Sequence, residues 1–444
     1  MPAIAPKGTL ATSAVTAPHF LLLYAAMLVA AAGNTALQSV MPAIGREIGI
    51  ADLWVAIAYT WSAVLWVLLA PYWAEKSDRH GRKALTLMGV AGFIVSMLLC
   101  GLVLDLGLAG LIGGGVTFAL FAIFRAIYGA LGCATPSATQ AYLAAKTRRS
   151  GRVAALSALS SSFGLGTIIG PALAPLFVMP PVGLTGPLFA FALIAILVFA
   201  AILAWLPNDK YGRRAGRGAA MSYPSQASVV TGASVIAATA PGRRKRLKWN
   251  DERIRPWILA GVTAGHAQAA LLTCIGFFVI DRLALNPRGS EDSIAIVMMA
   301  SASATLAAQW GLIPRLNAGP RALLVWGAAI AAIGTIGTML ATDLYGITLG
   351  FAVASIGFGF TRPGFTAGAS LAVPLAEQGG VAGVITAANG ISFVAAPAIG
   401  MVLYTLSPDL PFAVSAVLLV LLAWLSRRLG DPGLLLASRP QHPR

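Results

Sequence analysis

Stretches of about 20 apolar residues recur along nearly the whole chain, and this pattern restricts the fold more than any other feature. Each run is continuous rather than alternating, which favours helices over a β-barrel. Only 10% of the residues are charged, compared with about 25% in soluble domains. The sequence therefore predicts an all-α membrane protein with twelve transmembrane helices, at 19–43, 53–73, 84–104, 110–137, 153–178, 187–206, 256–280, 293–313, 322–341, 346–372, 382–406 and 411–426.

Basic residues predict the orientation of these helices. If the N-terminus is cytoplasmic, 26 of the 31 Lys and Arg fall in inner segments, and only Arg46, Arg282 and Arg288 fall outside. This asymmetry is the positive-inside pattern. We therefore expect an uncleaved first helix, both termini in the cytoplasm and a location in the bacterial inner membrane. The net charge of +16 then reflects topology and contact with anionic lipids, not nucleic-acid binding.

The one long polar stretch, residues 207–255, divides the chain into two candidate domains, 1–206 and 256–444. Its composition of Gly, Ala, Ser and Arg predicts a flexible cytoplasmic linker. A regulatory or lipid-binding role for the basic cluster 243–248 is the alternative.

The two halves resemble each other. "FGLGTIIGPALAP" (163–175) and "NGISFVAAPAIG" (389–400) align with a glycine on a glycine and Pro171 on Pro397. Each half also has one arginine inside a predicted helix, Arg125 and Arg362. Duplicated six-helix units around a midplane cavity are typical of transporters.

"AEKSDRHGRK" (74–83) is a dense charged stretch between the second and third predicted helices. Glycine permits a tight turn there, and a carboxylate can accept bonds from a helix N-terminus or from arginines. The stretch resembles the Gly-x3-Asp-Arg-x-Gly-Arg-Lys signature of the major facilitator superfamily, although Ala74 replaces the leading glycine. The resemblance extends over essentially the whole chain and implies two pseudo-symmetric six-helix bundles, with an inner clasp formed by Asp78, Arg79, Gly81, Arg82 and Lys83.

"GTIIGPALA" (166–174) resembles the fifth-helix signature of the drug:proton antiporter and exporter branches of that superfamily. Small residues four apart, Gly166 and Gly170, permit close helix packing, and Pro171 bends the helix. We expect these residues and Pro397 to act in gating.

"FRAIYG" (124–129) holds Arg125 inside an apolar helix, where a guanidinium costs about 2.5 to 3.5 kcal/mol at the least. All 15 acids fall in predicted loops or at helix ends, so no helix core supplies a carboxylate partner. One interpretation is that backbone carbonyls, Gln, Asn or water satisfy Arg125 and Arg362. The other interpretation is that both arginines bind an anionic substrate.

Neighbouring side chains suggest an amphipathic organic anion. The helical spacing puts aromatic residues on the same face as each arginine, and the first helix offers amides instead of the carboxylate expected from the resemblance. We predict substrate binding by Arg125, Arg362, Tyr128, Phe121, Phe358, Asn34 and Gln38. His266 is the candidate proton carrier, with packing as the alternative.

The sequence thus predicts a monomeric secondary-active transporter that works by alternating access and exports a small organic anion or drug-like compound. We expect coupling to protons or exchange for a counter-anion. An uptake permease or exchanger for organic acids, and an exporter of a carboxylate siderophore, are the alternatives. We find no nucleophile–base pair, metal-ligand cluster or nucleotide-binding loop, and we expect neither an enzyme nor a cofactor.

Overall fold

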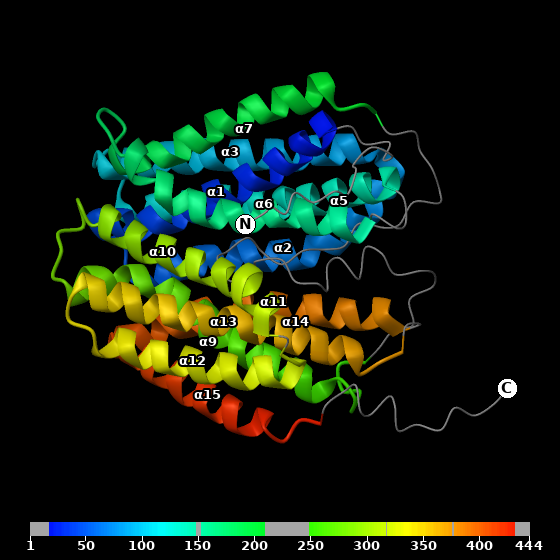
Figure 1. Ribbon diagram of the computed structural model, residues 1–444. Coiled ribbons are helices and arrows are strands. Elements are labelled where there is room, and N and C mark those ends of the chain that lie inside the picture. Colours follow the sequence, from blue (N-terminus) through cyan, green and yellow to red (C-terminus); the bar gives the residue numbers. More distant parts are fainter. Residues whose placement is uncertain (1–16, 148–151, 209–247, 317, 375–376, 431–444) are drawn as a thin grey trace, which may run out of the picture.

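The computed structural model describes residues 17–147, 152–208, 248–316, 318–374 and 377–430, and all its regular elements are helices (Figure 1). The N-terminal half contains α1 (Ala17–Glu47), α2 (Asp52–His80), α3 (Arg82–Leu108), α4 (Gly114–Ile127), η1 (Tyr128–Gly132), α5 (Ala134–Lys146), α6 (Arg152–Leu173), η2 (Pro175–Phe177), η3 (Gly183–Thr185) and α7 (Gly186–Trp205). The C-terminal half contains α9 (Arg255–Arg282), α10 (Glu291–Leu306), η5 (Ala307–Leu312), α11 (Ile313–Leu316), α12 (Pro320–Leu340), α13 (Leu344–Leu371), α14 (Gln378–Leu406) and α15 (Leu410–Ser426).

These helices confirm the predicted fold of two six-helix halves. Within the described residues, α4, η1 and α5 form one span, as do α10, η5 and α11. Ten spans are long and apolar enough to cross a membrane, and α6 and α15 contain the shorter apolar stretches Ser161–Leu173 and Leu410–Ser426. The fourth span begins later and ends later than its predicted window of 110–137, because Gly110 and its neighbours form a turn and α5 continues to Lys146.

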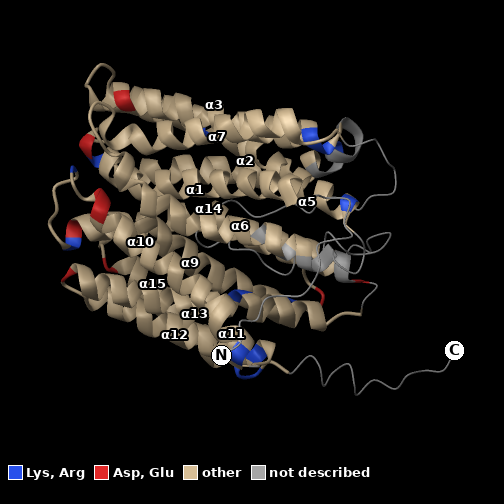
Figure 2. Ribbon diagram, turned by 45° about the horizontal axis from the view of Figure 1, so that its top comes forward, with Lys and Arg blue, Asp and Glu red and all other residues tan. Residues whose placement is uncertain are grey.

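The two ends of the bundle differ in charge (Figure 2). At the acidic end, acids lie at or near the helix termini: Asp52, Asp105, Asp281, Asp343 and Asp409. At the opposite, basic end lie Lys83, Lys146, Arg321 and Arg427. The domain boundaries at 206 and 256 stay predictions, because most of the proposed linker, 209–247, is outside the described residues.

Glycines bring α1 and α6 into close contact. A Cβ atom at Gly166 would lie 2.6 Å from the Leu28 carbonyl oxygen, and one at Gly170 would collide with the Ala32 carbonyl oxygen. Thr35 Oγ1 lies 3.4 Å from the Gly166 carbonyl oxygen, to which it can donate. The backbones can approach this closely only because these positions have no side chain. Pro171 lies inside α6, which ends two residues later.

Both halves also contact each other directly. The helix pairs α2–α14 and α6–α10 cross the boundary between the halves. A Cβ atom at Gly390 would lie 2.9 Å from Val67 Cγ2, and one at Gly276 would lie 2.6 Å from Pro42 Cγ. Small residues thus permit the close approach of the halves as well as the packing within each half.

Candidate functional site

A cavity lies between the two halves. Both halves contribute to its lining: Gln38, Met41, Pro42, Val55, Tyr59 and Ala63 come from α1 and α2, and Ala269, Leu272, Thr273, Phe277, Phe393 and Pro397 come from α9 and α14. Most of this lining is apolar or aromatic, with a few polar groups, as in sites for small molecules. We refer to it as the central cavity. Two predicted site residues, Gln38 and Pro397, are part of it.

An ion network joins the two halves at the acidic end of the central cavity. Arg46, in the last turn of α1, forms ion pairs with Asp52 at 2.7 Å and with Asp281 of α9. Tyr404 of α14 donates a hydrogen bond of 2.6 Å to Asp281. The guanidinium carbon of Arg46 also lies 5.5 Å from the centre of the Phe277 ring. Separation of the halves at this end would therefore break both ionic and aromatic contacts.

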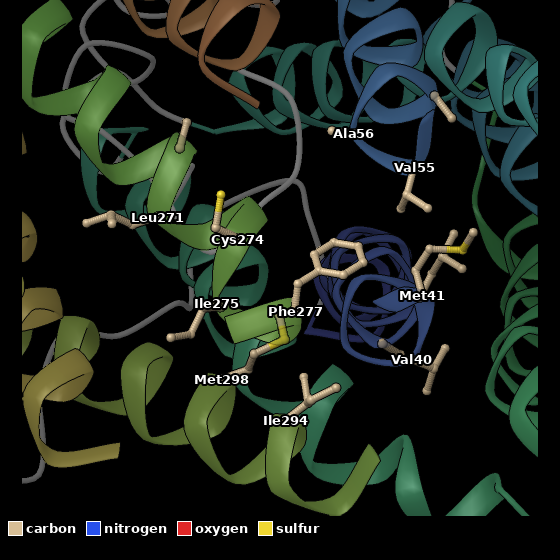
Figure 3. Packing of buried hydrophobic residues seen from close by; sticks show 14 of the residues in the cluster. Val40, Met41, Val55, Ala56, Leu271, Cys274, Ile275, Phe277, Ile294 and Met298 are labelled. Atoms are coloured by element: carbon tan, nitrogen blue, oxygen red, sulfur yellow. The ribbon is translucent and has the colours of Figure 1, made fainter. Parts of the chain in front are cut away.

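Next to the ion network, the two halves also contact each other through apolar side chains. Buried side chains of α1, α2, α9 and α10 meet there (Figure 3). Phe277 of α9 points toward α1, close to Met41 (Figure 3). Because Met41 and Phe277 also line the central cavity, this packing forms the wall of the cavity on its acidic side.

Arg125 is fully buried at the end of α4. It donates a hydrogen bond to Asn34 Oδ1 of α1, and its guanidinium carbon lies 4.7 Å from the ring centre of Tyr128 and 5.5 Å from that of Tyr59. These are the kinds of contact that compensate a buried guanidinium. The structure thus brings together three residues that the sequence selected, Arg125, Asn34 and Tyr128.

Tyr59 connects this cluster to the central cavity, since its ring contacts Arg125 and also lines the cavity. Arg125 itself is not among the lining residues. The sequence analysis missed Tyr59, because nothing in an apolar window distinguishes a tyrosine that faces an arginine on another helix. Tyr128 belongs to η1, a π-helical turn, and such turns are frequent at functional sites.

Arg362 lines a second, smaller cavity, formed wholly by residues of the C-terminal half. We call it the C-half pocket. Its polar lining comprises Gln268 of α9, Thr361 and Arg362 of α13, and Asn389 and Ser392 of α14. Arg362 is only 8% exposed, and its Nε has no hydrogen-bond partner among the described residues. Gln268 and Asn389 were not predicted, because they come from helices that are distant in the sequence.

His266 is half-buried on α9, where the adjacent Gly265 and the nearby Gln268 line the C-half pocket. Its Nδ1 lies 2.8 Å from the Val262 carbonyl oxygen and 3.3 Å from Ser392 Oγ. Because a carbonyl only accepts, the contact with Val262 requires the proton on Nδ1. Ser392 thus links His266 to the wall of the C-half pocket.

The two predicted phenylalanines are buried. Phe121 packs edge-on against Tyr59, with ring centres 6.5 Å apart, and Phe358 belongs to the main hydrophobic core. Phe365, about two helical turns further along α13, lines the C-half pocket. Substrate binding by Phe121 and Phe358 stays a prediction.

The charged stretch 74–83 is described only in part. The side chains of Asp78 and Arg79 are outside the described residues. Gly81 has φ +89° between α2 and α3, a conformation that favours glycine. Arg82 is buried at the start of α3, and Lys83 donates a hydrogen bond of 2.9 Å to the Leu203 carbonyl oxygen of α7. The gating role of this stretch stays a prediction.

The described helices form two halves around a central cavity, an arrangement typical of membrane transporters. The sequence profile of the Major Facilitator Superfamily matches residues 23–397. The chain therefore belongs to the major facilitator superfamily. Within the described residues, no group of three or more His, Cys, Asp or Glu is arranged to hold a metal ion.

Curated relatives match part of the chain. Multidrug resistance protein MdtG of Proteus mirabilis is 30% identical over 147 residues, which is 32% of this chain and 33% of that protein. The MdtG of Dickeya zeae is 27% identical over 185 residues, or 40% of this chain and 42% of that protein. The chain thus spans less than half the length of these relatives.

Solved structures match nearly the whole chain at low identity. The human organic anion transporter MFSD10 (TETRAN) has a TM-score of 0.62 and 16% identity, with 92% of this chain and 99% of that chain covered. A bacterial homologue of the human lysosomal transporter Spinster, in an inward-facing and occupied conformation, has a TM-score of 0.69 and 15% identity, with 92% and 96% covered. At such identities these similarities establish the fold.

Proposed function

We propose that this protein exports small amphipathic organic anions or drug-like compounds from the bacterial cytoplasm by alternating access. The observation that carries the proposal is the central cavity, whose lining is divided between the two halves. Because each half contributes a wall, movement of one half against the other would change which side of the membrane has access. The partial similarity to two multidrug resistance proteins favours export over uptake.

The charge distribution supports an orientation with the basic end in the cytoplasm, so that both termini are cytoplasmic. In that orientation the ion network of Arg46, Asp52 and Asp281 closes the outer side. These side chains are 17% to 34% exposed, so each ion pair contributes little by itself, about 1 kcal/mol or less. Contacts this weak can break and re-form during a transport cycle. On the inner side we assign the clasp role to Asp78, Arg79, Gly81, Arg82 and Lys83, and flexing of the helices to Gly166, Gly170, Pro171 and Pro397.

Energy coupling is assigned to His266, with protons as the coupling ion and exchange for a counter-anion as the alternative. The residue is half-buried at membrane depth and joined to the C-half pocket through Ser392. An imidazole can change its charge near neutral pH. If His266 carries the proton, His266→Gln should abolish uphill transport driven by a pH gradient while exchange of labelled for unlabelled substrate persists. Loss of both activities, or of neither, would contradict this assignment.

Counterflow in proteoliposomes tests the proposed function. The purified full chain would be reconstituted and presented with labelled organic anions, organic cations and neutral drugs. We expect exchange of at least one amphipathic compound, and loss of anion exchange in Arg362→Gln but not in Arg315→Gln, a control at an exposed position. Inside-out vesicles then distinguish export from uptake, because an exporter accumulates substrate in them. Exchange of no compound in the panel would contradict the proposal.

A further inference from the structure

The C-half pocket differs from the central cavity in that more of its lining residues are polar and one of them is an arginine, Arg362. We propose that it is a binding subsite for a carboxylate or comparable oxyanion, and that the apolar body of the same compound occupies the central cavity. The inference rests on the proposed function and adds to it a location, a head-group chemistry and an orientation for the substrate.

Arg362 is the first support for an oxyanion. It lines the pocket, is 8% exposed, and its Nε has no hydrogen-bond partner among the described residues. None of the ion pairs between described side chains includes it. A guanidinium is strongly disfavoured in such a place unless an anion compensates its charge. A bound carboxylate would supply the missing acceptor.

Asn389 supplies a second donor from another helix. Its side chain is 8% exposed and lines the same pocket, and its Nδ2 also has no hydrogen-bond partner among the described residues. Buried amide groups are nearly always hydrogen-bonded, so two such donors at one cavity are unusual. A carboxylate has two oxygens that accept, and it can therefore satisfy both donors at once.

The position of Phe393 sets the orientation of the compound. Phe393 lines both the C-half pocket and the central cavity, so the two adjoin at this ring. The C-half pocket is the smaller of the two and suits a head group of a few atoms, whereas the central cavity, with Met41, Leu272 and Phe277 in its wall, suits an apolar or aromatic body. A compound with its charge at one end would fill both spaces.

Arg125, the corresponding arginine of the N-terminal half, lines neither the central cavity nor the C-half pocket. Arg125 is fully buried, donates to Asn34 and lies against two aromatic rings. We therefore infer preference for a compound with a single anionic end over one with two anionic ends that bridge the halves.

Binding of benzoate and benzamide to the purified full chain tests the subsite. The two probes share a ring and differ in the head group, carboxylate or neutral amide. Thermal unfolding at constant ionic strength reports binding, because a ligand that binds the folded state raises the unfolding temperature. We expect benzoate to stabilise the wild type at concentrations where benzamide does not.

Two variants and a control complete the experiment. Arg362→Gln removes the charge and should weaken benzoate about tenfold or more. Asn389→Asp keeps the size of the side chain but puts a carboxylate beside Arg362, and it should weaken benzoate to a similar extent without loss of folding. Arg315→Gln, the same change at an exposed site, should bind benzoate as the wild type does.

Equal stabilisation by benzoate and benzamide, or unchanged benzoate binding in both Arg362→Gln and Asn389→Asp, would overturn the inference. Absence of benzoate binding to the wild type would also overturn it, even if counterflow succeeds. Failure of counterflow with intact, Arg362-dependent benzoate binding would instead contradict the proposed transport and leave the subsite supported.

Discussion

Arg125 and Arg362 occupy related positions in the two halves but have opposite surroundings. Arg125 is completely buried, donates to Asn34 and contacts the rings of Tyr59 and Tyr128. Arg362 borders a cavity instead. Related sequence positions therefore need not have related roles. In our interpretation, Arg125 stabilises the N-terminal half and Arg362 binds a ligand.

The largest expected effect is loss of stability in Arg125→Leu. The change removes the donor to Asn34 and both cation–π contacts, which together are worth about 3 kcal/mol or more in a desolvated site. Thermal unfolding of the ligand-free protein would measure it through tryptophan fluorescence, since Trp66 packs against Tyr128 with ring centres 5.4 Å apart. An unfolding temperature equal to that of the wild type, together with lost anion exchange, would make Arg125 a substrate ligand instead.

Asn34→Leu should have the next largest effect, about 2 kcal/mol of destabilisation, because it leaves the buried guanidinium without its amide acceptor. Asn34→Asp is the matched control, since a carboxylate of the same size keeps an acceptor for Arg125. We expect its unfolding temperature to remain closer to that of the wild type. If the two variants unfold alike, the hydrogen bond between Arg125 and Asn34 contributes little.

Arg362→Leu should leave the ligand-free protein as stable as the wild type or raise its stability by about 1 kcal/mol, because it removes a buried charge that has no compensating partner. The same unfolding measurement, made without added anions, checks this. A loss of stability as large as that expected for Arg125→Leu would contradict the difference between the two arginines and favour a structural role for both.

The smallest expected effect concerns Tyr59, which belongs to both the Arg125 cluster and the central cavity. Tyr59→Leu should cost about 1 kcal/mol through loss of the ring over the guanidinium, whereas Tyr59→Phe should retain most of that contribution. Counterflow of aromatic compounds should fall in the leucine variant more than in the phenylalanine variant. Equal stability and equal counterflow in the leucine and phenylalanine variants would argue against a role for the ring.

Much of the fold could be predicted from sequence, since membrane-spanning helices follow from composition alone. The twelve windows correspond to the observed spans, although α5 continues to Lys146, beyond the predicted end at 137. The small-residue motif of α6 predicted close packing, which the structure has at Gly166 and Gly170. The site was harder to predict from sequence. Arg125, Arg362, Asn34 and Gln38 were predicted as site residues, but Tyr59, Gln268 and Asn389 were not. An apolar helix gives little indication of which side it turns toward its neighbours.

By itself, the sequence determined that the protein is a helical membrane protein, where its helices lie, that it has two related halves, and that two arginines lie inside the apolar spans. These properties follow from the free energy that it costs to place polar groups in a bilayer. That cost depends on the residues of each segment alone. Only the tertiary structure decided that Arg125 meets an amide and two rings while Arg362 meets a cavity. That difference depends on the rotation and close packing of helices distant in sequence, and these are set by contacts that no single segment contains.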